Sequence, residues 1–84
     1  MIIVYNGVKY WVDDGKADAK DKNPLVRIAA AKQGYGLDIL IKDKDRSVRF
    51  AVACQGYDSG VLIKDKDPTI RQAVARYKYA TLIK

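Results

Sequence analysis

Three arginines at equal spacing are the residues of this chain that could most directly bind a ligand. Arg27, Arg49 and Arg71 follow one another at intervals of 22 residues. Because the planar guanidinium group suits phosphate oxygens, a row of three could bind a nucleic-acid backbone. An aspartate also stands four residues before Arg49 and before Arg71, so each arginine could instead join an Asp–Arg pair that ties one helix start to its neighbour. The recurrence of acid and arginine together favours this structural pairing.

Lysines and tyrosines recur with the same period. The lysines alternate with aspartates that cancel most of their field, so we expect a solvated loop edge rather than a basic binding stripe. The tyrosines could stack on single-stranded nucleic acid, but an aromatic residue just after a helix more often packs on that helix. The lysine pairs are Lys20/Lys22, Lys42/Lys44 and Lys64/Lys66, and the tyrosines are Tyr35, Tyr57 and Tyr79.

The residue types give little support to catalysis. The chain has no histidine and no glutamate, so all ten acids are aspartates. Its single cysteine, Cys54, has no base partner in the sequence pattern, and there is no glycine-rich phosphate loop or metal-ligand spacing. We therefore predict a non-enzymatic protein without a metal or cofactor.

The recurring arginines, lysines and tyrosines belong to a sequence repeat that covers most of the chain. Three segments align without a gap, and they read DKNPLVRIAAAKQGY (21–35), DKDRSVRFAVACQGY (43–57) and DKDPTIRQAVARYKY (65–79). A fixed period of this size predicts a solenoid, in which each unit buries its apolar face against its neighbours. The third copy lacks the Gln-Gly-Tyr ending, as expected of a terminal repeat.

Each copy carries signals for where its helices begin and end. Asn23, Asp45 and Asp67 are suited to cap a helix start, and Gly34 and Gly56 to end the first two long helices. We expect a shorter helical segment of one or two turns after each long helix, at residues 37–42, 59–64 and 81–84.

Differences between the copies separate ligand positions from scaffold positions. The helix positions of Val26, Ala29, Ala30 and Gln33 barely change, so they form the packing stripe. Three positions on another face do change, and the residues there predict a partner-binding surface. Its members are Leu25, Ile28, Lys32, Phe50, Cys54, Gln72 and Arg76.

Two opposite interpretations of that face remain open. Ile28 and Phe50 would be exposed apolar anchors beside Lys32 and Arg76, which is typical of protein interfaces. Alternatively, the face packs on the short helices or the N-terminal segment, which makes Phe50 an ordinary core residue. Cys54 is expected to be exposed, because its equivalents in the other copies are lysine and arginine.

The first fourteen residues predict a β-hairpin. Two β-rich runs (2–5 and 8–12) flank Asn6-Gly7, a strong signal for a two-residue turn. This turn places Ile3, Tyr5, Val8 and Tyr10 on one face and Ile2, Val4, Lys9 and Trp11 on the other. Because a lone hairpin is marginal in water, one face should cap the first repeat. Ile2, Val4 and Trp11 would then be free for a partner or a second copy.

The repeat motif D-x-D-x-x-V-R-x-A-V-A, with a leucine-containing segment after it, resembles HEAT-like repeats. Its short period is closer still to the leucine-rich-repeat variant, an α-solenoid that alternates a longer and a shorter helix. The resemblance covers residues 21–84. It implies a mostly α fold, a short right-handed α-solenoid of about three 22-residue repeats capped by the hairpin. Such repeats mostly bind proteins, and a minority, including alkylpurine DNA glycosylases, hold nucleic acid on a cationic concave surface.

Length and composition fit one domain, with the hairpin at 1–14, a connection at 15–22 and helical repeats at 23–84. The net charge of +6 permits a nucleic acid, an anionic surface or an acidic protein as partner. No apolar run is long enough to span a membrane, and a single cysteine fits a reducing compartment, so we expect a cytoplasmic protein.

Two hypotheses on function follow from the sequence. The first is a protein-binding module, an inhibitor or adaptor, with a homodimer through the hairpin as one form of it. Small basic chains of this kind also occur as phage or mobile-element inhibitors of host proteins. The second is nucleic-acid binding through a basic solenoid face.

Overall fold

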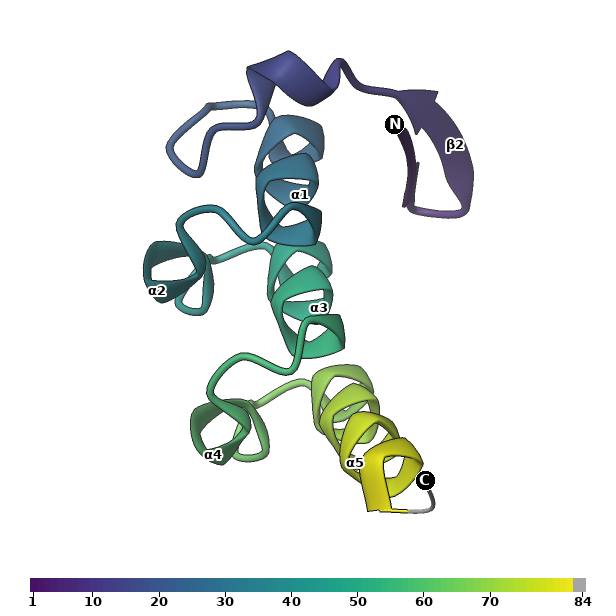
Figure 1. The fold of residues 1–84 in the computed structure, drawn as a ribbon, viewed down its shortest axis with the longest axis vertical. Coiled ribbons are helices and arrows are strands. Elements are labelled where there is room, and N and C mark those ends of the chain that lie inside the picture. Colours follow the sequence, from purple (N-terminus) through teal and green to yellow (C-terminus); the bar gives the residue numbers. More distant parts are fainter. Residues whose placement is uncertain (83–84) are drawn as a thin grey trace.

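The structure, a computed structural model, describes the backbone of residues 1–82 and the side chains of residues 1–77. The chain starts as a two-stranded antiparallel hairpin and continues as helices (Figure 1). The elements in order are β1 (Ile2–Tyr5), β2 (Val8–Trp11), the 3-10 turn η1 (Asp14–Lys16), α1 (Pro24–Lys32), α2 (Leu37–Leu40), α3 (Arg46–Cys54), α4 (Ser59–Leu62) and α5 (Pro68–Leu82). The mostly helical fold with an N-terminal hairpin confirms the coarse prediction.

The hairpin has the predicted register. Ile3 pairs with Tyr10 and Val4 with Lys9, and both turn residues have positive φ, 54° at Asn6 and 77° at Gly7. This conformation matches the strand twist and is the reason for the Asn-Gly pair. β1 packs on α1 with Ile3 fully buried, whereas all four residues of β2 are exposed. The hairpin therefore covers the first long helix with only one of its strands.

The three long helices begin as predicted, because a side chain caps each start. The side-chain oxygen of Asn23 accepts the N–H of Leu25 at 3.0 Å. Asp45 and Asp67 do the same for the residues two positions on, at 2.8 Å and 2.9 Å. Each cap satisfies an N–H that has no partner within its own helix.

The ends of the helices follow the prediction only in the first two copies. α1 and α3 end before Gly34 and Gly56, which have φ of 82° and 73°. In the third copy Lys78 stands at that position, and nothing favours a left-handed residue there. α5 therefore continues through Leu82. The prediction of a separate short helix at 81–84 is wrong for residues 81 and 82, and residues 83 and 84 lie outside the described part of the chain.

The long helices pack in chain order, α1 on α3 and α3 on α5. The short helices α2 and α4 project on one side of this row, and the hairpin lies on the other side beside its first member (Figure 1). One apolar cluster joins these parts, from Ile3 through Ala30, Leu40 and Val52 to Val74. Because the hairpin shares this cluster with the helices, its position is set by burial of apolar surface.

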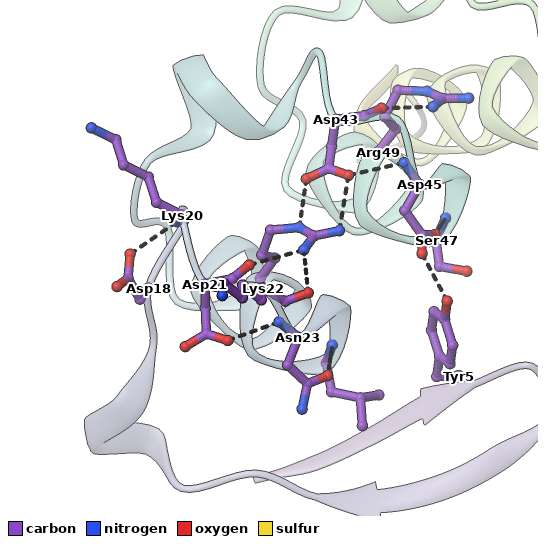
Figure 2. Close-up of polar contacts among 12 residues, drawn as sticks. Tyr5, Asp18, Lys20, Asp21, Lys22, Asn23, Asp43, Asp45, Ser47 and Arg49 are labelled. Atoms are coloured by element: carbon purple, nitrogen blue, oxygen red, sulfur yellow. Dashed lines mark hydrogen bonds and ion pairs between the residues drawn. The ribbon is translucent and has the colours of Figure 1, made fainter.

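Buried arginine–aspartate pairs connect each copy to the next. Arg27 Nε lies 2.8 Å from Asp43, and Arg49 Nε lies 2.8 Å from Asp65, with an Nη2 contact to the second oxygen in both. Nη1 of Arg49 also donates to the Asp43 carbonyl at 2.7 Å (Figure 2). The predicted structural pairing is therefore confirmed for Arg27 and Arg49. The acid is the first aspartate of the following copy and not the helix cap.

Arg71 differs from its two equivalents. Its Nη1 donates to the Asp65 carbonyl, as expected from the other copies, but the side chain is exposed. No carboxylate pairs with it among the described residues. Equivalent positions of the repeat thus hold an arginine that is paired with an aspartate, at Arg27 and Arg49, and one that is not, at Arg71 among the described residues.

This difference gives a matched test of stability. Arg49→Met should lower the free energy of unfolding by about 3 kcal/mol, because it leaves the buried Asp65 carboxylate without its partner. Arg71→Met should lower it by less than about 1 kcal/mol, since the guanidinium is exposed. Urea unfolding followed by circular dichroism measures both values. Equal losses at the two positions would contradict the assigned role of the pair.

Candidate functional site

Two adjoining grooves run along the side of the helix row that faces the hairpin. The first encloses about 700 Å³ and has walls from β1, α1, α3 and α5. The second encloses about 360 Å³ between α3 and α5. Both are lined by Phe50, Cys54 and Thr69, so they adjoin along these residues. We call the two grooves together the trough.

Six of the seven predicted partner-binding residues line the trough. Four of them, Ile28, Lys32, Phe50 and Cys54, line the first groove. Gln72 and Arg76 line the second groove beside Phe50 and Cys54. The positions that differ between copies therefore come together on one surface.

Two residues of the predicted surface are buried or half-buried. Leu25 lines neither groove and is half-buried against the apolar cluster. Ile28 lines the trough but is only 3% exposed, so of the two open interpretations the packed one holds for Ile28. β1 packs on α1 and shields this part of the face. Phe50, one copy further on, remains 40% exposed and is not an ordinary core residue.

The hairpin supplies a wall that the sequence did not reveal. Val4 and Asn6 line the first groove, and of these only Val4 was expected to face a partner. The Tyr5 hydroxyl donates to the Asp45 carboxylate at 2.7 Å and fixes the hairpin beside the start of α3 (Figure 2). This hydrogen bond raises the pKa of the Tyr5 phenol. The contact spans 40 residues of chain, so no local pattern predicts it.

The other two residues of the predicted hairpin surface stay outside the trough. Ile2 is 53% exposed and Trp11 is 74% exposed. They lie on the hairpin face opposite Ile3, together with Val4. An apolar surface of this kind on a marginal two-stranded sheet remains available for contact.

The charged groups that line the trough in the described part of the chain are cationic. Lys32 of α1, Arg46 of α3 and Arg76 of α5 line it, and none of its lining residues in the described part of the chain is acidic. Arg46 Nη1 lies 3.4 Å from the Asp67 carboxylate, outside the trough. The Thr69 backbone N–H, assisted by Arg46, lowers the pKa of Asp67. The trough therefore combines apolar surface with one cation from each long helix.

Cys54 lies between the cationic positions of the neighbouring copies. The side chain is exposed, as predicted. The groove walls still desolvate the sulfur, and this raises the pKa of the thiol, while the positive charge of Lys32 acts in the opposite direction. The thiol is thus accessible but poorly ionised at neutral pH.

The recurring lysines and tyrosines are not predicted ligand positions, and the six lysines, Tyr35 and Tyr57 lie outside the trough. The six lysines of the predicted loop edge are all exposed, which confirms their solvated position. Tyr35 and Tyr57 are exposed, and the Tyr79 side chain lies outside the described residues. Within residues 1–82, no helix is long and apolar enough to cross a membrane. The described side chains also contain no cluster of acids and cysteine that could hold a metal ion.

The raised pKa of Cys54 predicts slow alkylation. Because the thiolate is the reactive form, a higher pKa leaves less of it at a given pH. Iodoacetamide should react more slowly with the folded chain at neutral pH than with the same chain in urea, and the pH profile should shift upward. Lys32→Ala should shift the profile further in the same direction. A faster reaction in the folded state would contradict this description of the groove.

Comparison of this chain with protein-family models, with curated proteins and with solved structures finds no match.

Proposed function

We propose that the chain is a non-enzymatic protein-binding module and that the trough is its binding surface. The observation that carries the proposal is the coincidence of two independent features. Six of the seven residues singled out at positions that differ between otherwise similar copies line the trough. Residues that packed one copy on the next would be held constant by that packing, so variation is expected where a ligand is contacted.

The architecture proposed for this module is a short right-handed α-solenoid of about three 22-residue repeats. The equivalent contacts of Arg27 and Arg49 support it, since each joins one copy to the next in the same geometry. Resemblance to HEAT-like repeats supports the same architecture. In such a row of helices, ligands bind across several units rather than to one.

The composition of the trough favours protein binding over catalysis and over nucleic-acid binding. Its exposed apolar centre, Phe50, lies beside apolar residues such as Ile28 and Ile70 and is flanked by polar and cationic side chains, as is usual for an interface anchor. The thiol of Cys54 is poorly ionised, which does not suit a nucleophile. Arg27 and Arg49, which could have bound phosphates, are engaged with buried aspartates.

The exposed hairpin face supports a second, smaller contact within the same proposal. Ile2 and Trp11 present apolar surface on a two-stranded sheet whose outer edges are unpaired. A partner or a second copy could extend that sheet by strand addition. This contact would be separate from the trough, because neither residue lines it.

A displayed library of random peptides tests the proposal directly. Peptides selected on the immobilised chain should bind the Phe50→Asp variant at least about tenfold more weakly, since a charge replaces the apolar anchor. Bound peptide should also protect Cys54 from alkylation, because the thiol lines the same trough.

Ile39→Asp is the matched control for that experiment. Ile39 of α2 is 45% exposed, close to the 40% of Phe50, but lies outside the trough. Selected peptides should bind this variant like the original chain. Peptides that lose binding on Ile39→Asp and keep it on Phe50→Asp would place the binding surface elsewhere and reject the proposal.

A further inference from the structure

Half of the acids of this chain are used to shape the turns before the long helices. In these turns, five carboxylates accept the backbone N–H group two residues further along the chain, at distances of 2.8–2.9 Å. They belong to Asp21, Asp43, Asp45, Asp65 and Asp67. All stand in the turns before the long helices, whereas Lys32 and Arg76 lie further along α1 and α5. No acid is among the described residues that line the trough.

The cations of the trough are spread along its length. Lys32 and Arg76 occupy equivalent positions in the first and the last long helix, and Phe50 lies on the helix between them. With about 9 Å between neighbouring helix axes, the two cations are roughly 20 Å apart. About six residues of extended chain, or about thirteen residues of helix, cover that distance.

We infer that the trough binds an acidic segment of a partner protein, with an aromatic or branched aliphatic side chain against Phe50 and carboxylates near Lys32 and Arg76. The inference rests on the proposed function and adds the chemistry of the partner. Charge complementarity of this kind orients a ligand and speeds its association, while the buried apolar side chain supplies most of the affinity.

A nucleic-acid strand fits the same surface less well. In a duplex each strand carries a phosphate about every 3.4 Å of helix axis, so about six phosphates of one strand would lie along 20 Å. The trough offers three cations, and one of them, Arg46, already lies 3.4 Å from the Asp67 carboxylate. Its centre is apolar, with Ile28, Phe50 and Ile70 among the lining residues. Strongly charged phosphates would find too few partners there.

The test uses random displayed peptides of about fourteen residues, long enough for either conformation. Peptides enriched on the full chain should contain aspartate or glutamate on both sides of a bulky apolar residue. A synthetic copy of an enriched peptide should bind the double variant Lys32→Glu, Arg76→Glu with a Kd at least about tenfold higher. Replacing the acids of the peptide by lysine should restore binding to this double variant.

The double variant Lys42→Glu, Lys64→Glu is the control, because it makes the same charge change at exposed lysines of the loop edge. Its Kd for the enriched peptide should change less than about threefold. Enriched peptides that need Phe50 but show no excess of acids would overturn the inference and leave the proposed function standing. If no enriched peptide is sensitive to Phe50→Asp, both fail. A single-stranded oligonucleotide that displaces the peptide and binds more tightly would also overturn the inference.

Discussion

The buried pair between an arginine and the first aspartate of the following copy is the contact on which the other features depend. In Asp43, Oδ1 accepts the N–H of Asp45 at 2.9 Å while Oδ2 binds Arg27 at 2.8 Å. One carboxylate therefore holds the preceding helix and shapes the turn that starts the next one. Replacing both partners by apolar residues can be neutral for stability, so the pair matters more for register than for net free energy. It fixes how far α3 is displaced along α1.

This use of aspartate determines the charge of the opposite surface. Asp65 and Asp67 repeat the arrangement of Asp43 and Asp45, with N–H contacts of 2.9 Å each. These carboxylates stand before the helices, whereas Lys32 and Arg76 lie further along α1 and α5, so the turns separate acids from these two cations along the chain. Of the charged residues that line the trough in the described part of the chain, all are therefore cations, in a protein with a net charge of +6. Aspartate suits this task better than glutamate, because its shorter side chain reaches the backbone N–H two residues on.

The sequence was sufficient to predict those features whose conformation is decided by residues close by in the chain. Asn6-Gly7 predicted the hairpin register, and Asn23 and Asp45 predicted helix starts, because each acts within a few residues. The trough was predicted in part, since comparison of the copies identified Phe50 and Cys54 without any knowledge of packing. The sequence left the burial of Ile28 open, because it depends on how the hairpin, which is distant in sequence, packs on α1. The continuation of α5 was visible as the missing glycine at Lys78, but the period of the repeat suggested a break.

The exposure of Ile28 and Phe50 shows that the hairpin covers the first of these two equivalent positions and leaves the second open. Ile28 on the first helix is 3% exposed and lies where β1 packs on α1, whereas Phe50 on the second helix is 40% exposed. At the far end the Tyr77 ring lies over Gly56, where a Cβ on that glycine would collide with it. The hairpin and Tyr77 thus bound the same face from two sides. A ligand bound between the hairpin and Tyr77 would cover α3 in the way that the hairpin covers α1. The repeat provides three equivalent positions, Ile28, Phe50 and Gln72; the first is buried and the other two are exposed, so Phe50 is the apolar one that remains open to a partner.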